Sequence, residues 1–444
     1  MSSTSSRRTR STPPVEPLRV VVAAGGTGGH VFPGIAVAAA LRRRVPEAVI
    51  TFAGTADRLE ATLVPAAGYE LDTTPMVAFP RRPGLAALLF PARFVRCVLA
   101  ARRQLRHRRA QVVVGVGGYP SVPAVVAGWT LGLPVVVHES NATPGLANRL
   151  AARLSGRVAC AFDPAGTGLG AGTEVRRVGI PILPALASCE RASLRGPARA
   201  SWGVGPDELL VVVSGGSLGA ASLDRAAVEL ACAAGTPDGA SGTPGTAGTA
   251  GTAGGRLRLV VKASPTHLAS MRAALVRGGG DRVADVVTHL DDMAAAYSAA
   301  DVVVVRGGAC TVAEIEHLGV PAVVVPLPGA TDDHQTANAE ALAASGHAPV
   351  VVVRDGDLDG GTLAAALTRV LELVEAARAS PLASSSGASP HAGAADAVAG
   401  WVVELVSGSA ASSSSSSAAS SITTGTSTST STSTSTGTTE GTTR

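Results

Sequence analysis

The sequence predicts an α/β protein with two doubly wound, Rossmann-like domains that face a central cleft. Continuous valine-rich runs alternate with alanine- and leucine-rich stretches of helical length, which is the pattern of parallel strands covered on both faces. The chain has 444 residues, of which 46% are hydrophobic and 16% charged, so disorder throughout is excluded. Two successive series of such runs fill most of the chain, and we therefore expect two domains.

Each series alternates expected strands with expected helices. Strands of the first series are expected at 18–24, 48–53, 112–116, 134–138 and 157–161. Helices between them are expected at 33–45, 56–66, 92–108, 121–131 and 143–154. The second series gives strands near 208–214, 257–262, 283–288, 301–305, 321–326 and 349–353. A last amphipathic helix is expected at about 391–406.

Low-complexity stretches frame the two expected domains. Serine, threonine, glycine and alanine repeats cannot bury enough apolar surface to become ordered. We expect a disordered tail at 1–17, a first domain at 18–184, a second domain at 185–388 with a flexible insertion at 233–255, a C-terminal helix at 389–406 and a disordered Ser/Thr tail at 407–444. The seam lies near Gly179-Ile180-Pro181, where the first series ends.

The five cysteines are scattered and form no C-x-x-C pair. This pattern argues against a disulfide scaffold or a zinc site and favours reduced thiols in a cytoplasm. Residues 1–17 contain no apolar core, so no signal peptide is expected. Asp355-Gly356-Asp357 has the D-x-D pattern of a metal site on a diphosphate, but a charged turn after a strand is the favoured interpretation.

The strongest local motif is Gly25-Gly26-Thr27-Gly28-Gly29-His30, between an expected strand and a helix. Glycines let a ligand approach the backbone, and a helix start offers free N–H groups. A dinucleotide fingerprint fails here, because Val31 stands where the third glycine is required and no acid ends the second strand. His30 is a candidate general base near neutral pH, and a helix-capping role for it stays open.

Two further strand ends of the first domain carry polar or glycine residues. Gly117-Gly118-Tyr119 follows one expected strand, and His138-Glu139-Ser140-Asn141 follows the next. The carboxyl ends of parallel strands meet at one edge of a sheet, which is where ligands bind in such folds. The sequence therefore predicts a ligand crevice at this edge.

The second domain repeats the arrangement. Ser214-Gly215-Gly216-Ser217-Leu218-Gly219 and 306–314 each follow a strand and open a helix. Thr311 stands at a helix start, which suits phosphate, and Glu314 can accept two hydrogen bonds from a ribose diol. The spacing T-x-x-E also fits a capping box, so a structural role for Glu314 stays open. Asp332, Asp333, His334, Gln335 and Asn338 form another polar strand end.

The motifs GGTGGHVFPGIAVA, VGVGGYPS, HESNATPGLANRLAA, SGGSLGA, LDDMAAAYSAADVVVVRGGACTVAE and DDHQTANA stand in this order between about residues 18 and 400. The series resembles that of the MurG family, the glycosyltransferase family 28 enzymes with the GT-B fold that serve peptidoglycan synthesis. The resemblance implies an inverting hexosyltransferase that moves N-acetylglucosamine from UDP-GlcNAc to the C4 hydroxyl of undecaprenyl-diphosphate-MurNAc-pentapeptide, converting lipid I to lipid II. It also implies a bacterial enzyme of cell-wall biogenesis, cell shape and division, peripheral on the cytoplasmic face of the cell membrane.

The resemblance assigns roles position by position. His30 is implied as the catalytic base, and neither a cofactor nor a metal ion is implied. The first domain would face the acceptor and the membrane, the second would bind the UDP-sugar, and the C-terminal helix would pack back on the first. Implied UDP-GlcNAc contacts are Thr27, Gly28, Gly29, Asn141, Ser217, Leu290, Ala309, Cys310, Thr311, Val312, Ala313, Glu314 and Gln335. Implied acceptor contacts are Gly26, Gly117, Gly118, Tyr119 and Glu139. Other cell-wall synthesis proteins are candidate partners.

Three positions depart from the family pattern on the donor side. Leu183 replaces an arginine, Leu218 replaces a glutamine, and Val261, followed by Lys262, stands where a histidine is usual. Two alternatives therefore stay open. One is a related GT-B enzyme, such as a UDP-sugar epimerase or another lipid-acceptor transferase, and the other is a donor-impaired, non-catalytic lipid-binding homologue.

A basic, partly apolar segment lies between Arg81 and Arg109, with nine arginines and no acid. Apolar residues interleave with the arginines, which suits docking on an anionic membrane surface. Nucleic acid is not the expected partner, because only Phe90 and Phe94 could stack on bases. A solvated helix face is the remaining alternative.

Overall fold

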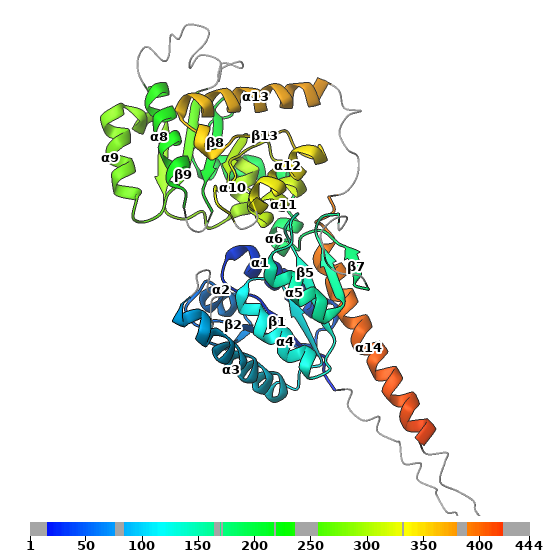
Figure 1. The fold of residues 1–444 in the computed structure, drawn as a ribbon. Helices are drawn as coiled ribbons and strands as arrows, with labels where there is room; N and C mark the ends of the chain where they lie inside the picture. The colour runs from blue at the N-terminus through cyan, green and yellow to red at the C-terminus, as the bar shows by residue number, and fades with distance from the viewer. Residues whose placement is uncertain are drawn as a thin grey trace, which may run out of the picture. The chain divides into compact units, whose positions relative to one another are not determined.

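Two parallel β-sheets, each with helices packed on it, make up the fold (Figure 1). The computed structural model describes residues 16–75, 84–163, 169, 172–216, 219–235, 256–330, 333–379 and 389–420. Within these residues every strand pairing is parallel, which confirms the predicted α/β class with two Rossmann-like sheets. The predicted boundaries of the two domains, at 184 and 388, stay predictions.

The first sheet has the order β3-β2-β1-β4-β5-β6-β7 among the described strands. Its strands are β1 (Arg19–Ala23), β2 (Val49–Gly54), β3 (Glu70–Thr73), β4 (Val112–Gly115), β5 (Val135–Glu139), β6 (Arg157–Cys160) and β7 (Glu174–Arg177). Sequence analysis missed β3 and β7. Both are edge strands of the first sheet, and their charged side chains interrupt the continuous apolar run from which the other strands were predicted.

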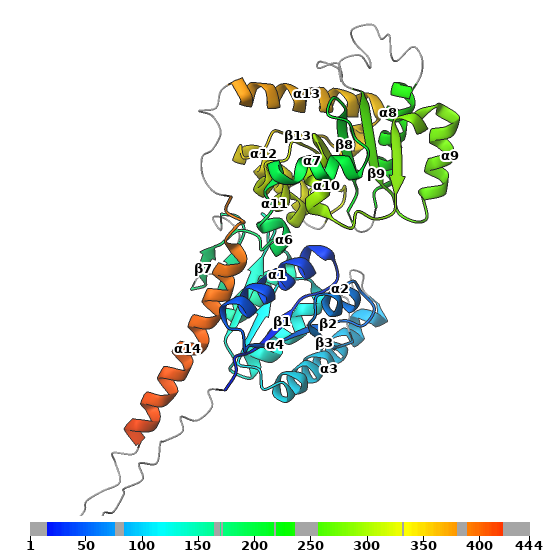
Figure 2. The ribbon, with the colours of Figure 1, turned by 180° about the vertical axis from the view of Figure 1, so that it is seen from behind.

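Helices cover both faces of the first sheet. They are α1 (Gly28–Arg44), α2 (Glu60–Ala66), α3 (Leu85–His107), α4 (Val122–Thr130) and α5 (Leu146–Ser155), with a 3-10 turn at Tyr119–Ser121. Side chains of α3, α4 and α5 pack with Val21 of β1 in one cluster. Val22 points the other way, toward Gly34 of α1. Figure 2 views the molecule from behind and shows α1. The two faces of β1 are therefore both buried, as its continuous valine run predicts.

The second sheet has the order β10-β9-β8-β11-β12-β13. Its strands are β8 (Leu209–Ser214), β9 (Leu257–Lys262), β10 (Ala284–Val287), β11 (Val302–Val305), β12 (Ala322–Val324) and β13 (Val350–Val352). Its helices, with those that lead into it, are α6 (Pro184–Ala187), α7 (Arg191–Ser201), α8 (Ala221–Gly235), α9 (Leu268–Gly278), α10 (Met293–Ala299), α11 (Ala309–Leu318), α12 (His334–Ser345) and α13 (Gly360–Ala379).

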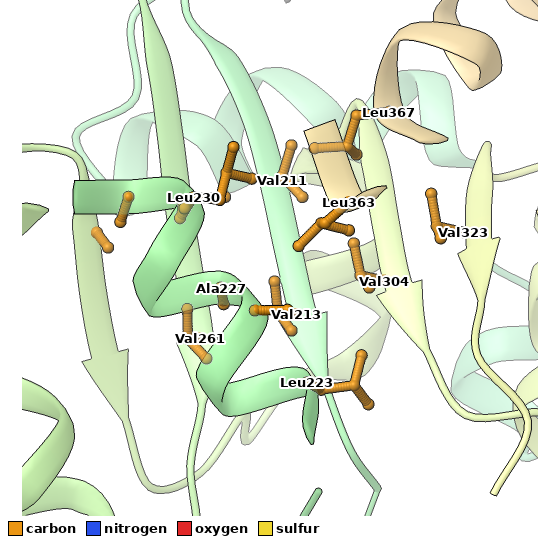
Figure 3. Close-up of a cluster of buried hydrophobic side chains, with 14 of the residues drawn as sticks. Val211, Val213, Leu223, Ala227, Leu230, Val261, Val304, Val323, Leu363 and Leu367 are labelled. Atoms are coloured by element: carbon orange, nitrogen blue, oxygen red, sulfur yellow. The ribbon is translucent and has the colours of Figure 1, made fainter. Parts of the chain in front are cut away.

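The core of the second sheet divides by the alternation of strand side chains. Val211 and Val213 of β8 face α8 and α13, where Leu223 and Leu363 are fully buried (Figure 3). Leu210 and Val212 belong to the opposite cluster, with α7, α10, α11 and α12. Burying one such leucine or valine side chain contributes roughly 1.5–3 kcal/mol, so two covered faces give this sheet a large stabilisation.

The last described helix, α14 (Ala394–Ser420), begins among contacts with the first sheet and its helices. Asp396 forms an ion pair with Arg43 at 3.0 Å, and the Arg176 guanidinium lies 4.2 Å from the centre of the Trp401 ring. Residues 407–420, where sequence analysis expects the start of a disordered tail, are helical in this structure, and the predicted disorder of 407–444 stays a prediction. Alanine has the highest helix propensity and serine a moderate one, so the helix can extend past its apolar part. The described residues from Val403 onward belong to a second compact unit.

Some predictions lie partly or wholly outside the described residues. The tail at 1–17 is described only at 16 and 17, the insertion at 233–255 only up to Gly235, and the tail at 407–444 only up to 420. Ser217, Leu218 and Asp332 are not described. Among the helices that the structure describes, none combines the length and the apolar character needed to cross a bilayer.

Candidate functional site

His30 stands in the first turn of α1, which begins at Gly28, earlier than predicted. The first glycine turn, residues 25–29, therefore runs directly into helical backbone. The ring atom Nδ1 of His30 lies 3.1 Å from Oγ1 of Thr27. Burial, together with the nearby His334, lowers the pKa of His30 to about 4, against a smaller opposing effect of Glu60. The imidazole is thus neutral at pH 7, the form in which it can accept a proton.

The second glycine turn, Gly117–Gly118, lies directly against His30. A Cβ atom at Gly117 would stand 2.7 Å from Cδ2 of His30, and one at Gly118 would stand 2.4 Å from the Gly25 carbonyl oxygen. Both residues have positive φ, 98° and 78°, which also favours glycine. The two turns that the sequence placed on neighbouring strands are therefore in contact, with the exposed Tyr119 next to them.

Glu60 is a residue of this site that sequence analysis missed. Its carboxylate is fully buried and accepts hydrogen bonds from the Gly26 N–H at 3.0 Å and from the N–H and hydroxyl of Thr55 at 3.0 and 2.6 Å. The Gly26 N–H is consequently occupied inside the protein. The only sequence signal was an acid at the start of a helix that follows the second strand, which is common at helix N-termini.

The end of β5 carries an organised amide network. Glu139 is buried, and its oxygens accept from the Asn141 N–H at 2.8 Å, the Asn141 side chain at 3.1 Å and the Asn148 side chain at 2.9 Å. Desolvation raises the pKa of Glu139, and these hydrogen bonds oppose the rise. In this arrangement Glu139 positions two amides, and its predicted contact with the acceptor stays a prediction.

Asn338 of α12 joins this network to the second sheet. Its side-chain oxygen accepts from the Ala142 N–H at 3.0 Å, and its NH2 group donates to Asn141 Oδ1 at 3.3 Å and to the Gly307 carbonyl at 3.2 Å. The side chain is fully buried. One amide therefore holds together the loop after β5 and the loop after β11.

The helix α11 starts directly after β11, with Gly308 as its N-cap. Thr311 is thus inside the helix, and a capping box between Thr311 and Glu314 does not form. Instead, Glu314 Oε2 accepts a hydrogen bond of 2.8 Å from the Tyr297 hydroxyl. Desolvation raises the pKa of Glu314 to about 7, and the bond from Tyr297 partly offsets this. A partly buried carboxyl with a strongly raised pKa is typical of a functional site.

The starts of α1 and α11 meet. The Cys310 thiol donates to the Gly29 carbonyl oxygen at 3.5 Å, and Ala309 and Ala313 pack in one cluster with Ile180 and Ile182. Val312 and Ala313 are fully buried and Ala309 nearly so, which leaves backbone groups as what they can offer a ligand. Two helix N-termini that lie together provide N–H groups and positive dipole ends for an anion.

The other predicted donor residues lie in different settings. Gln335 is in the first turn of α12, where its Oε1 accepts from the Leu327 N–H at 3.0 Å. Leu290 lies between β10 and α10, partly buried against the core. Ser217 lies outside the described residues.

Arg306, which follows β11, forms several hydrogen bonds within the protein. Its guanidinium donates to Asp355 at 2.6 Å, to Ser222 at 2.9 Å and to the carbonyl oxygens of Val325 and Pro326. Asp355 of the D-x-D turn is thereby engaged in an ion pair. Val261, at one of the three departures, has its side chain in the core.

Comparison with known proteins identifies the family. Two family models match, the glycosyltransferase family 28 N-terminal domain over residues 20–160 and the glycosyltransferase family 28 C-terminal domain over residues 210–397. A curated UDP-N-acetylglucosamine–N-acetylmuramyl-(pentapeptide) pyrophosphoryl-undecaprenol N-acetylglucosamine transferase of Paenarthrobacter aurescens is 40% identical over 395 residues, which are 88% of this chain and 97% of that protein. The chain belongs to glycosyltransferase family 28.

Other family 28 proteins and solved structures agree. A relative with the same name from Clavibacter michiganensis is 40% identical over 83% of this chain and 92% of its own length. The crystal structure of MurG from Acinetobacter baumannii matches with a TM-score of 0.61 and 25% identity, over 87% of this chain and all of that one. A UDP-GlcNAc 2-epimerase from Neisseria meningitidis shares the fold, with a TM-score of 0.59, 12% identity and coverage of 88% and 99%.

Proposed function

We propose that this chain transfers N-acetylglucosamine from UDP-GlcNAc to the C4 hydroxyl of undecaprenyl-diphosphate-MurNAc-pentapeptide, with inversion at the anomeric carbon. The meeting of the His30 turn with the start of α11, in a chain 40% identical to named transferases of this specificity, carries the proposal. In the reaction the C4 oxygen forms a bond to the anomeric carbon as the bond to the UDP diphosphate breaks. The products are a β-1,4-linked disaccharide lipid and UDP.

The roles follow from the chemistry of the groups. His30 takes the proton of the attacking hydroxyl, directly or through a water molecule, since its imidazole is neutral at pH 7. The backbone N–H groups of Thr27, Gly28 and Gly29 and those of 309–313 stabilise the leaving diphosphate at two helix starts. Glu314 accepts from the ribose hydroxyls, Leu290 contacts the uracil, and Asn141 and Gln335 contact the sugar. Ser217 adds a hydroxyl donor.

The acceptor side is the pair of glycine turns in the first domain. Gly117 and Gly118 pack against His30 and Gly25 where a Cβ atom would clash, so an acceptor diphosphate bound by the backbone of this turn would lie beside His30. Gly26 contributes surface rather than its N–H, which Glu60 already binds. Tyr119 is 40% exposed and can contact the acceptor sugar or its lipid linkage.

The decisive experiment is an assay of the purified chain with UDP-GlcNAc and a lipid I analogue. Formation of the disaccharide product with release of UDP supports the proposal. Conversion of UDP-GlcNAc to its C2 epimer without an acceptor would favour the epimerase class, and acceptor binding without turnover would favour the non-catalytic alternative.

The acid side of the pH profile tests the base. A general base must be unprotonated, and a pKa of about 4 keeps His30 unprotonated until the pH falls toward that value. We therefore expect kcat for the transfer to show no loss with a midpoint near 6.5, the ordinary pKa of histidine. The measurement is kcat between pH 4.5 and 8 at saturating substrates. A midpoint near 6.5 that His30→Gln removes would contradict the lowered pKa.

We further propose that α3 docks the protein on an anionic membrane surface, on the cytoplasmic face where the acceptor lipid would be found. Leu85, Leu88, Val95 and Leu99 are roughly half exposed or more. Arg102 donates to the Thr130 carbonyl at the end of α4, so the exposed Trp129 lies at the α4 end that α3 contacts. Exposed apolar side chains beside arginines suit the headgroup region of a bilayer. Arg81 and Arg82 of the same segment lie outside the described residues.

Replacing Arg93, Arg96 and Arg103 with glutamine should weaken binding to vesicles that contain anionic lipid. Each charge near such a surface contributes about 1 kcal/mol, so we expect roughly a hundredfold loss. Activity on a soluble acceptor analogue should be retained. A triple variant at the exposed Arg277, Arg282 and Arg354 removes the same charge outside α3 and serves as the control. Equal losses in both variants, or binding insensitive to salt, would contradict docking through α3.

A further inference from the structure

Lys262 is the only lysine in the chain. The other 36 of the 37 basic residues counted as lysine or arginine are arginines. The two side chains differ in shape, since arginine presents a broad planar fork and lysine a compact ammonium with three N–H donors. Because every other such charge is an arginine, the chain has a compact ammonium group at this position only. The surroundings of Lys262 therefore indicate which ligand the group can bind.

The position of Lys262 is fixed by the second sheet. It is the last residue of β9, paired in register with Ser214 at the end of β8. Val261 before it is buried in the core on the other side of the strand, so Lys262 is the polar residue at this strand end. Its Nζ donates a hydrogen bond of 2.8 Å to the carbonyl oxygen of Gly216, in the glycine turn that leads into α8.

The charge on Lys262 has no counter-charge in the described part of the chain. The half-buried ammonium bonds a neutral carbonyl, and none of the ion pairs formed by described residues includes it. Burial lowers the pKa of Lys262, and no neighbouring carboxylate opposes this. A partly desolvated ammonium with spare donors, beside a turn that opens a helix, is matched by an anionic oxygen.

The other candidate cations are Arg306, which is bonded within the protein, and Arg177, which lies on the first sheet. Arg306 is held by Asp355, Ser222 and two carbonyl groups. Arg177 is exposed on β7, an edge strand of the first sheet. The side chains of Leu183 and Leu218 contain no polar atoms.

We infer that the ammonium group of Lys262 binds the diphosphate of UDP-GlcNAc, in place of the polar side chains that Leu183 and Leu218 lack. This inference rests on the proposed function and assigns one of its contacts. Lys262 remains bonded to the Gly216 carbonyl through one N–H and donates the others to phosphate oxygens. Its role is to bind the leaving group, so it should affect ligands that contain phosphate and leave a bare nucleoside unaffected.

The test measures equilibrium binding of UDP-GlcNAc, UDP and uridine to the full chain and to Lys262→Met. A hydrogen bond between charged partners is worth enough to change affinity by about tenfold to a hundredfold. We expect that loss for UDP and UDP-GlcNAc and no loss for uridine. Lys262→Arg should restore affinity in part, because it keeps the charge in a larger group. Arg258→Gln removes a charge from the same strand, where Arg258 is paired with Asp285, and should bind UDP as the wild type does.

A single lysine also allows a direct observation of the group. In a chain labelled with 13C-lysine, one side-chain Cε resonance reports on Lys262. UDP should shift this resonance and raise the pKa measured from it, and uridine should do neither. Unchanged UDP affinity in Lys262→Met, or equal responses to UDP and uridine, would overturn the assignment while leaving the proposed function intact. Failure of the wild-type chain to bind UDP would overturn the proposed function, and this assignment with it.

Discussion

Replacing His30 with alanine is expected to lower kcat for transfer to the lipid I analogue by about 10²–10⁴-fold, the usual effect of losing a general base. Donor affinity should stay near that of the wild type. The reason is geometric: the imidazole stands between Thr27 and the second glycine turn, whereas the uridine side of the proposed site is built by α11 and its neighbours.

The comparison needs a control and a check of the fold. His107 is an exposed histidine at the end of α3, and His107→Ala should leave kcat on a soluble acceptor unchanged. Unfolding in urea should show that His30→Ala remains folded. If kcat and UDP affinity fell by the same factor, His30 would be a donor contact and not the base.

Glu314→Ala is expected to weaken UDP binding by about 1.5–3 kcal/mol, or roughly 10- to 150-fold, because hydrogen bonds to a carboxylate are lost. The carboxylate form is the one that accepts from two hydroxyl groups. Since the pKa of Glu314 is raised to about 7, UDP affinity of the wild type should increase as the pH rises from 6 to 8. Titration calorimetry at several pH values measures both effects, and Glu314→Gln should lose this pH dependence.

Tyr297→Phe is the matched control, since it removes the hydroxyl that bonds Glu314 and keeps the carboxylate. It should change UDP affinity much less than Glu314→Ala does.

The free energy of unfolding of the Glu314 variants shows whether Glu314 serves ligand binding or the fold. A carboxyl with a raised folded-state pKa lowers stability once the pH exceeds its unfolded pKa, so Glu314→Gln should not destabilise the fold at pH 8. Loss of stability as large as the loss of binding would make Glu314 a structural residue.

Valine-rich strands could be predicted from the sequence, including β10 and β13 at the edges of the second sheet, whereas the charged edge strands β3 and β7 of the first sheet could not. The valine run of β1 needs both faces covered, so its pattern reveals its position. In β7, with the sequence EVRR, three of the four side chains are exposed, and nothing in that pattern distinguishes it from a loop. The start of α1 was placed too late because glycines usually indicate a turn, although here the helical backbone begins among them.

The site could be predicted as far as the strand order determines it. Parallel strands bring the two glycine turns to one edge, and their contact at His30 follows from that. The role of Glu60 depends on a carboxylate returning to a turn far away in the sequence, for which no local pattern exists. The hydrogen bonds between Cys310 and Gly29 and between Asn338 and the loop after β5 depend on tertiary packing, so they could not be predicted from the sequence either.

Asn338 shows which side-chain atoms are needed to connect the loop after β5 with the loop after β11. Aspartate has nearly the same shape, but it would turn an oxygen toward Asn141 Oδ1 and the Gly307 carbonyl, converting two attractive contacts into repulsive ones. Leucine would fit the volume and leave the Ala142 N–H and two oxygens without partners, at a cost of about 1–3 kcal/mol for each buried group. Neither isostere is acceptable, so this position is constrained by the identity of single atoms on its amide and not by its size.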